Sequence, residues 1–449
     1  MGISFNNIKL TGQVIGKAFT SIVTDTLWPY VSLLLNGDGA ANGANNNTFV
    51  DSSPNNYAIT ASGSPAQGSF SPYGNLWSNY FNGTNATQDA IICPVTNLTT
   101  GNFTVEVWGN FQSTGNDQQI IDLGASGFSL YLTGSGIRVF NRVLGADLFG
   151  ATAPITFGQW THIAFVLTTG TTNGANLYIN GVKQLTATSN TSFSSTTVTV
   201  GSRYAYYSSA PAGWFGVLGY LSNARITNTI VYTSNFTPST SPLTAVTGTA
   251  LLTCQSNRFI DNSSNAYALT INGAPSVQRF SPFSPTSAYS KSLISGSGYF
   301  NGSSDLSIPS FPVIGNNSFT AETWFYMTTV PASGSAGTIF SMNANSGTYG
   351  AFRVEITPTS QIQLLMSTDG ANWQINSGAI SNVMLNEWMH VAITRNATSG
   401  AVDMYLNGQS IFTGSIGSLY GVPSIKSGQA RMQPIVYISH YRDIFRMRE

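Results

Sequence analysis

Residues 159–182 read Q-W-T-H-I-A-F-V-L-T-T-G-T-T-N-G-A-N-L-Y-I-N-G-V. Two runs of β-branched and aromatic residues flank a Gly/Thr/Asn-rich linker, a pattern that predicts a β-hairpin. The second run ends in Asn180-Gly181, a pair that readily adopts the positive φ angles of a tight turn. Side chains alternate between the two faces of a strand, and here both faces of the first run carry apolar groups.

The same unit returns later in the chain, as Glu387-Trp388-Met389-His390-Val391-Ala392 followed by Met404-Tyr405-Leu406-Asn407-Gly408. Other motifs also recur in the same order. The matching segments are 49–59 with 259–269, 70–73 with 280–283, 80–83 with 299–302, 102–108 with 318–324, and 220–225 with 437–442. Repeats of this length indicate tandem duplication of a whole domain, because solenoid repeats are roughly 20–50 residues long.

The duplication predicts two domains, at residues 30–240 and 241–449. The Pro/Ser/Thr-rich stretch 237–243 is the expected linker between them. The chain of 449 residues suits this division, since a β-sandwich typically takes roughly 200 residues.

Residues 1–29 lie outside the repeat and form an N-terminal arm. Ile15, Phe19, Ile22 and Val23 in this arm fall at helical spacing. Two roles stay open for the arm: docking on a partner or a larger assembly, or covering its own sandwich.

Composition favours an all-β protein with long loops. Hydrophobic residues make up 42% of the chain in short alternating runs, and charged residues only 8%. Because 17 basic residues balance 17 acidic ones, no net field favours nucleic acid or a charged membrane surface. The N-terminus lacks the apolar core of a signal peptide and no run is long enough to span a membrane, so we expect a soluble chain made in the cytoplasm, without membrane insertion.

The ordered motifs F-T-x-E-x-W, W-x-H-x-A, Y-x-N-G and G-Y-x-S-x-x-R resemble those of laminin-G-like, concanavalin-A-like jelly-roll domains. More narrowly, L-L-L-N-G-D-G at 33–39, F-x-D-S-S-x-N-x-Y at 49–57 and G-S-F-S-P-Y at 68–73 resemble repeats in virion proteins of tailed phages of marine bacteria and cyanobacteria. The resemblance covers residues 30–449. It implies two tandem antiparallel jelly-roll β-sandwiches behind a short N-terminal arm.

The resemblance also implies a role. The leading expectation is a non-enzymatic virion protein, a tail-fibre or head-surface component that displays lectin-like domains and binds host-surface polysaccharide. Other virion proteins, contacted through residues 1–29, and further copies of the chain are the expected partners. A purely structural decoration or spacer protein is the alternative, and a glycan-degrading enzyme is the third class, because the same fold serves all of these.

Titratable residues on the repeated strands predict packing and not catalysis. His162 and His390 stand beside tryptophans with no cluster at metal-ligand spacing, which favours hydrogen-bonded core histidines. Glu106 and Glu322 lack the second carboxylate that glycoside hydrolysis requires, so we expect buried glutamates bonded to backbone or hydroxyl groups and no catalytic residues.

Asp51 and Asp261 each begin a turn of Ser, Asn and Pro residues, and we expect their side chains to cap these turns. Calcium is the alternative that the resemblance implies, with Asp38 and Asp122 as further candidate ligands. No dense acidic loop supports it, so no metal is assigned.

The two cysteines do not occupy equivalent places in the repeats. Cys93 and Cys254 are therefore expected to be free and buried, with a bridge between the domains as the alternative.

The loop that begins at Gly201 is the candidate ligand-binding site. Its aromatic residues Tyr204, Tyr206, Tyr207 and Trp214 could stack on the apolar faces of sugar rings. The corresponding loop around residues 417–433 has only Tyr420, so the sequence places a glycan site in the first domain. Packing against a neighbouring subunit would use the same side chains and remains an alternative.

Overall fold

The computed structural model is all-β. It describes residues 8–9, 23–24, 31–33, 51, 55–62, 66–68, 77–83, 89–98, 101–203, 216–278, 297–300, 305–308, 312–342, 349–422, 425–427, 436–439 and 445–446. All the regular elements among them are strands. In that part of the chain, no helix is long and apolar enough to cross a bilayer.

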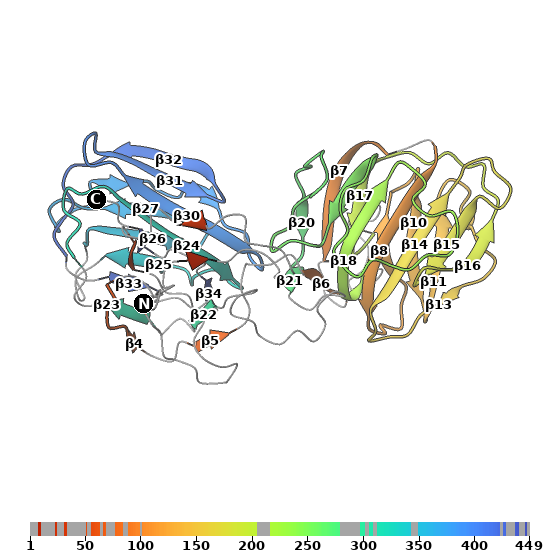
Figure 1. Cartoon of the computed structure of the whole chain (residues 1–449), viewed down its shortest axis with the longest axis horizontal. Coiled ribbons are helices and arrows are strands. Elements are labelled where there is room, and N and C mark those ends of the chain that lie inside the picture. The colour runs from red at the N-terminus through yellow and green to blue at the C-terminus, as the bar shows by residue number, and fades with distance from the viewer. Residues whose placement is uncertain are drawn as a thin grey trace, which may run out of the picture. The chain divides into compact units, whose positions relative to one another are not determined.

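Two compact units make up the chain. We call residues 74–288 with 385–387 the first sandwich, and residues 1–73, 289–384 and 388–449 the second sandwich. Each consists of two antiparallel sheets, a front sheet that contains the repeated hairpin and a back sheet behind it (Figure 1). This confirms the predicted pair of jelly-roll β-sandwiches.

The sheets of the first sandwich have the following strand orders. The front sheet runs β16 (Val182–Ala187), β15 (Ala175–Ile179), β14 (Thr161–Leu167), β8 (Phe103–Phe111), β18 (Leu218–Thr227), β6 (Ser78–Asn82) and β21 (Ser276–Gln278), with β19 (Thr249–Thr253) beside β18. The back sheet runs β12 (Ala146–Asp147), β11 (Gly136–Asn141), β10 (Phe128–Thr133), β9 (Gln118–Asp122), β17 (Ser195–Val200), β7 (Ala90–Leu98) and β20 (Thr270–Asn272), with β13 (Ala153–Pro154) beside β11.

The second sandwich repeats this arrangement. Its front sheet runs β32 (Gln409–Ser415), β31 (Ala401–Leu406), β30 (Trp388–Arg395), β24 (Phe319–Met327), β34 (Val436–Ser439), β22 (Ser297–Phe300) and β5 (Ala66–Gly68). In the same sheet β35 (Phe445–Arg446) pairs with β24 and with β3 (Val31–Leu33). The back sheet runs β28 (Ile375–Asn376), β27 (Gln361–Met366), β26 (Phe352–Ile356), β25 (Gly337–Met342), β33 (Ile425–Ser427), β23 (Asp305–Ile308) and β4 (Thr60–Ser62), with β29 (Ser381–Asn382) beside β27.

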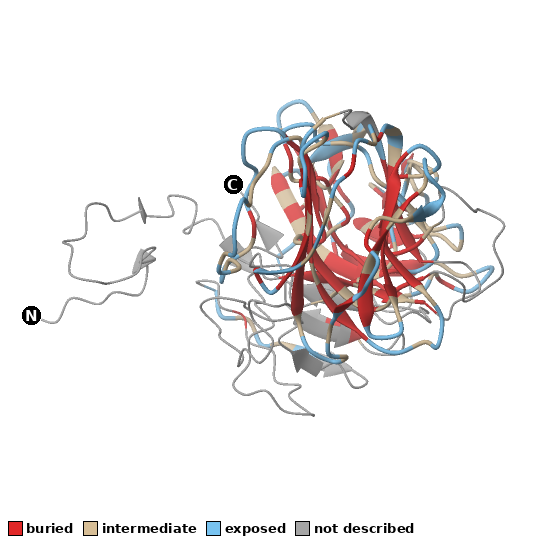
Figure 2. Ribbon diagram, turned by 90° about the vertical axis from the view of Figure 1, so that its right-hand side faces the viewer, coloured by how far each residue is buried: buried red, intermediate tan, exposed pale blue. Residues whose placement is uncertain are grey.

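Phenylalanines from both sheets fill the space between them. In the first sandwich Phe103 of β8 stacks on Phe128 of β10 with ring centroids 5.3 Å apart, and Phe165 of β14 meets both rings edge-on. In the second, Phe319 of β24 stacks on Phe352 of β26 at 5.4 Å. Figure 2 shows the buried residues gathered in the strands and the exposed ones in the loops. The equivalent stacked pairs show that both copies use one core design, built on large rigid rings.

The predicted hairpin is confirmed in both copies. β14 and β15 pair antiparallel, with Ile163 opposite Ile179. Asn180 and Gly181 have φ values of 50° and 78° and form the next turn, between β15 and β16. Asn407 and Gly408 repeat them at 51° and 81°. The left-handed backbone of the turn explains why both copies use Asn-Gly.

The compact units differ from the predicted ranges 30–240 and 241–449, because each sandwich is completed by strands from the other side of that boundary. β19, β20 and β21 pair with β18, β7 and β6 of the first sandwich. β3, β4 and β5 pair with β35, β23 and β22 of the second. Figure 1 shows the red and orange β4 and β5 among the strands of the second sandwich.

The expected linker 237–243 also lies inside the first sandwich. Leu243 is buried, and its backbone N–H donates to Asn223 Oδ1 over 2.7 Å. This segment therefore packs as part of a domain, and its Pro/Ser/Thr composition did not mark a boundary.

The described part of the N-terminal arm consists of β1 (Ile8–Lys9) and β2 (Val23–Thr24), which pair antiparallel. Val23 lies in a strand, so the predicted helical pattern is wrong at that residue. Ile15, Phe19 and Ile22 lie outside the described residues.

Candidate functional site

Glu106 is the centre of a buried polar cluster on the outer side of the first sandwich's front sheet. Its carboxylate accepts hydrogen bonds from Arg225 Nε at 2.9 Å and from the Tyr232 hydroxyl at 2.7 Å. His162 Nε2 lies 3.1 Å from the second carboxylate oxygen. Burial on its own would raise the pKa of Glu106, but the His162 hydrogen bond, the Arg225 charge and the Tyr232 hydroxyl lower it below its ordinary value.

Residues 228–247, which we call the covering segment, close this cluster off. Ile230, Tyr232 and Phe236 pack on the outer face of β14 and β15, against Ala164, Val166 and Tyr178. The Phe236 backbone N–H donates to Gly181 O over 2.9 Å, which ties the segment to the turn between β15 and β16. Glu106 and His162 are both 0% exposed. The Glu106 carboxylate is buried and already bonded to the side chains of Arg225, His162 and Tyr232. It can therefore stabilise the sheet but cannot reach a ligand.

The prediction of a packed, hydrogen-bonded histidine is confirmed at His162, and Glu106 is buried as expected. One of its partners is a hydroxyl, that of Tyr232, as predicted. The sequence analysis missed the ion pair with Arg225, which lies 119 residues away. The sequence did contain a sign of this ion pair, because an arginine ends the G-Y-x-S-x-x-R motif. The strand that carries this motif is β18, which pairs with β8.

The equivalent pair in the second sandwich is open. Glu322 and His390 lie 3.3 Å apart with side chains 28% and 23% exposed, and the Trp324 ring centroid lies 5.2 Å from that of His390. On the outward face of β24 and β30, Thr320, Glu322, Trp324, His390 and Thr394 are half-buried, whereas all of β14 is buried in the first sandwich. The expectation of core residues is therefore wrong for His390 and Glu322.

A second cluster lies on the back sheet of the second sandwich, around Trp373. The half-buried indole meets the Tyr349 ring at 5.1 Å between centroids, and the Arg353 guanidinium lies 5.5 Å from the indole centroid. Arg353 Nη1 is 3.5 Å from Glu355 Oε2, and Gln363 Nε2 donates to the other oxygen of Glu355. We call these five residues the Trp373 cluster. It combines aromatic surface, a cation, a carboxylate and a carboxamide.

Strand alternation positions the polar members of this cluster. On β26, Phe352, Val354 and Ile356 face the core, so Arg353 and Glu355 face outward. On β27, Gln363 lies directly opposite Glu355 and also faces outward. The Glu355 side chain is only 7% exposed, whereas that of Arg353 is 24% exposed.

The loop from Ser367 to Gln374 fixes Trp373. Asp369 Oδ1 accepts the backbone N–H groups of Ala371 and Asn372, and Asp369 Oδ2 accepts Gln374 Nε2 over 2.7 Å. These hydrogen bonds, the backbone ones first, lower the pKa of Asp369 below its usual range. The loop is thus held as an Asx-type turn by its own hydrogen bonds, so its backbone is ordered without a ligand.

The equivalent positions in the first sandwich carry different chemistry. Alignment of the stacked Phe128 and Phe352 places Tyr131 at the position of Glu355 and Arg138 at that of Gln363. There the Tyr131 hydroxyl donates to Asp147 over 2.8 Å and Arg138 forms an ion pair with the same carboxylate. The Trp373 cluster is therefore not part of the duplicated scaffold.

The candidate residues Tyr204, Tyr206, Tyr207 and Trp214 lie outside the described residues, and so does Asp38. The turn-capping role is confirmed for Asp261, whose carboxylate accepts the backbone N–H groups of Ser263 and Tyr267, and for Asp51, which accepts that of Tyr57. The Asp122 carboxylate accepts a hydrogen bond from the backbone N–H of Gly124 and forms an ion pair with Arg142. Within the described ranges, no group of three or more His, Cys, Asp or Glu side chains could hold a metal ion.

Cys93 and Cys254 are free and buried, as predicted. Burial raises the pKa of each thiol to about 12. No bridge between the domains is formed by these two residues.

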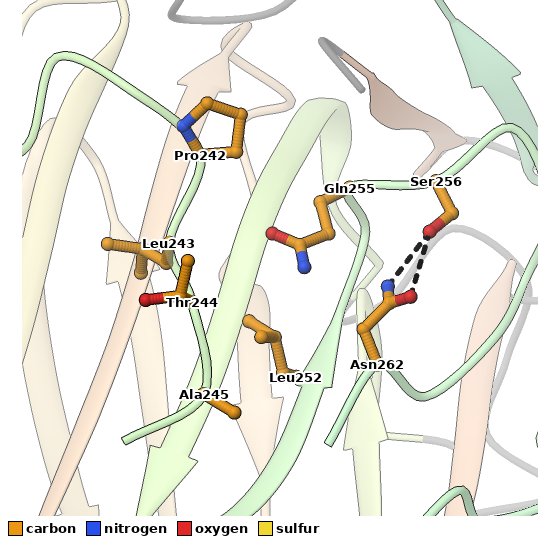
Figure 3. Close-up of a pocket in the computed structure, with 8 residues that line it drawn as sticks. All are labelled: Pro242, Leu243, Thr244, Ala245, Leu252, Gln255, Ser256 and Asn262. Atoms are coloured by element: carbon orange, nitrogen blue, oxygen red, sulfur yellow. Dashed lines mark hydrogen bonds between the residues drawn. The ribbon is translucent and has the colours of Figure 1, made fainter. Parts of the chain in front are cut away.

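A pocket of about 330 Å³ lies on the first sandwich between residues 242–245 and the segment after β19 (Figure 3). Its wall includes Leu252, Gln255 and the hydrogen-bonded pair Ser256 and Asn262. The eight lining residues include no aromatic or charged side chain. It lacks the stacking surface and the charged groups that the Trp373 cluster provides.

Comparison with known proteins agrees with the fold. The family model of the concanavalin A-like lectin/glucanases superfamily matches residues 82–231 and 300–428, which together are more than half of the chain. No curated protein sequence matches.

Similar solved structures include a proposed carbohydrate-binding protein from Bacteroides ovatus at 14% identity and a TM-score of 0.34, covering 46% of this chain and 60% of that one. A heptameric pentraxin from Limulus polyphemus shows 16% identity and a TM-score of 0.33, over 44% of this chain and 95% of the pentraxin. Mouse laminin α1 domains LG4-5 show 13% identity and a TM-score of 0.28, over 82% and 88%. On the family match to both sandwiches, the chain belongs to the concanavalin A-like lectin/glucanases superfamily.

Proposed function

We propose that this chain is a non-enzymatic carbohydrate-binding protein and that the Trp373 cluster is its glycan site. The observation that carries the proposal is a half-buried indole on a preformed loop beside outward-facing Arg353, Glu355 and Gln363. Binding sites for small ligands typically combine apolar or aromatic surface with a few placed polar groups.

The chemistry of the cluster matches that of a sugar ring. The C–H face of a pyranose packs on an indole, and sugar hydroxyls both donate and accept hydrogen bonds. Glu355 can accept from hydroxyls, while Arg353 and Gln363 can donate to them. A ligand that displaced Arg353 or Gln363 from the nearly buried Glu355 carboxylate without replacing the lost hydrogen bond would bind less well, which provides selectivity.

The proposed activity is binding without hydrolysis. Cleavage of a glycoside uses two carboxyl groups roughly 5–10 Å apart, one of them free to transfer a proton. Among the described residues, Glu355 is bonded to Arg353 and Gln363 and Glu106 to Arg225, His162 and Tyr232. These carboxylates already serve as hydrogen-bond acceptors for structural partners, which supports a binding role.

We further propose that the protein is a virion component that displays these domains at the particle surface for attachment to host polysaccharide. The support is the set of segments at 33–39, 49–57 and 68–73 that resembles phage virion repeats. Labelling purified particles with an antibody against the chain tests this. A fibre or head-surface signal supports the proposal, and particles without the chain contradict it.

A glycan array tests the binding site. We expect the wild-type chain to bind a subset of glycans and Trp373→Ala to lose at least about tenfold in affinity, equivalent to ~1.4 kcal/mol. Trp324→Ala, which removes another half-buried tryptophan of the same sandwich from the front sheet, is the matched control and should retain binding.

The other outcomes of the array separate the alternatives. Loss of binding only in a Tyr204→Ala, Tyr206→Ala, Trp214→Ala variant would move the site to the first sandwich. No binding by the wild type would contradict the glycan proposal and favour a structural decoration protein.

A further inference from the structure

The chain contains two similar sets of three short strands, and each set completes one sandwich. The middle set, β19–β21, adds one strand beside β18, one at the β7 edge and one at the β6 edge of the first sandwich. The leading set, β3–β5, adds strands to the second sandwich at β35, β23 and β22. β4 and β20 close the back sheets, while β5 and β21 close the front sheets.

The two sets have the same internal design. In the middle set Asp261 accepts the backbone N–H of Tyr267 at 3.0 Å, six residues on, and in the leading set Asp51 accepts that of Tyr57 at 2.8 Å. Equivalent residues of the sandwiches receive them, since Tyr80 lies opposite Ser276 and Tyr299 lies opposite Ala66. The sets are therefore structural counterparts, each fitted to the same pair of sheet edges.

Their order along the chain differs. The strands β6–β18 are followed by the set that completes them, the middle set. The strands β22–β34 are instead completed by the leading set, and residues 74–288 of the first sandwich lie between the two in sequence. The contact between the leading set and the second sandwich thus joins segments far apart in the chain.

We propose that the leading strands of one copy can complete the second sandwich of another copy, so that the chain associates head to tail by strand exchange. Exchange re-forms the same backbone pairs of β3 with β35, β4 with β23 and β5 with β22, so it costs no hydrogen bonds. The partner is a second copy of this chain, because the sheet edges of the second sandwich match these strands in register.

Exchange depends on concentration. Closure within one chain benefits from the effective concentration of tethered strands, whereas exchange between chains gains with the total concentration. A head-to-tail contact of this kind produces a ring if the rotation closes and a filament if it does not. The uncovered edges of β22 and β23 in a chain whose leading strands are engaged elsewhere would recruit the next copy.

Cross-chain disulfides test the proposal. A full-length chain with Ala66→Cys and a differently tagged full-length chain with Tyr299→Cys are produced together and oxidised. We expect a two-chain adduct whose yield rises with concentration, which reducing agent cleaves, and in which mass spectrometry links positions 66 and 299. The native Cys93 and Cys254 are buried and should not compete.

The matched control uses the equivalent pair of the first sandwich, Ser276→Cys in one chain and Tyr80→Cys in the other. It should give no more adduct than either single variant alone, because the middle strands follow their own sandwich. Ser62→Cys with Asp305→Cys, opposite each other on β4 and β23, is the second test pair in case the first pair prevents folding. If chains carrying both cysteines form the disulfide only within themselves, with cross-chain adduct at the control level at every concentration, the proposal is wrong.

Discussion

Replacing Glu106 by Gln should destabilise the first sandwich strongly. The substitution keeps the shape of the side chain but removes the negative charge that faces Arg225, whose side chain is 5% exposed. Removing one partner of a buried ion pair costs roughly 3–5 kcal/mol, because the remaining charge is left without compensation. For a domain of this size each kcal/mol lowers Tm by roughly 2–4 °C, so we expect Tm to fall by about 6–20 °C.

The second sandwich provides the matched control, Glu322→Gln. Its partner His390 is 3.3 Å away and both side chains are about a quarter exposed, with 28% for the glutamate and 23% for the histidine. Exposed pairs contribute roughly 0–1 kcal/mol, so this substitution should barely change stability. Differential scanning calorimetry of the full chain, read on the transition that each substitution moves, measures both. Equal shifts for the two variants, or a fall of less than about 2 °C for Glu106→Gln, would refute the reasoning that burial makes the difference.

Three further predictions follow from other features. Gly408→Ala should lower the free energy of unfolding by roughly 1–2 kcal/mol, because its φ of 81° alone strains an alanine. Gly181→Ala should lower it clearly more in urea denaturation, because the added Cβ would also lie 1.9 Å from a carbonyl oxygen of the covering segment. Equal losses for the two variants would contradict this contact. Burial raises the pKa of Glu387 from 4.5 to about 7 in the folded chain, so the free energy of unfolding should fall as pH rises from about 4.5 to 7. Glu387→Gln should flatten this pH dependence. A wild-type curve that is already flat in this range would show that Glu387 ionises normally. Cys93 and Cys254 should not react with a thiol reagent at pH 8 until the chain unfolds, since burial raises both pKa values to about 12; rapid labelling of the native chain would be inconsistent with this.

Sequence patterns predicted the scaffold because its signals are local and occur twice. Asn180-Gly181 and its counterpart Asn407-Gly408 mark the turn after the second strand of the predicted hairpin in both copies, and strand alternation identified the core faces. The completing strands were assigned to the wrong side of the boundary for a physical reason. Segments such as β4, T-A-S, and β21, S-V-Q, carry no apolar pattern that says which sheet edge they join, so only tertiary pairing decides it.

The sites were predicted less well than the fold. The burial of His162 and Glu106 was predicted correctly from their place on an apolar strand. The partial exposure of their counterparts His390 and Glu322 was not predicted, because the two strands look alike in sequence. His162 and Glu106 are buried because the covering segment packs on β14 and β15, a contact that involves residues far away in the chain. Trp373 carried a usable signal, a single tryptophan after the turn sequence D-G-A-N, but its polar neighbours on β26 and β27 come together only through strand pairing.

The placement of β3–β5 has a consequence for synthesis of the protein on the ribosome. The sheets of the first sandwich can form soon after β21 emerges, because all of their strands have been made by then. β3–β5 must wait until β22–β35 have been made, more than three hundred residues later, which takes roughly twenty seconds to somewhat over a minute at typical elongation rates. During that interval neighbouring ribosomes on one messenger hold many nascent chains with unpaired leading strands close together. Translation itself thus sets the local concentration at which a strand meets its own sheet or that of an adjacent chain.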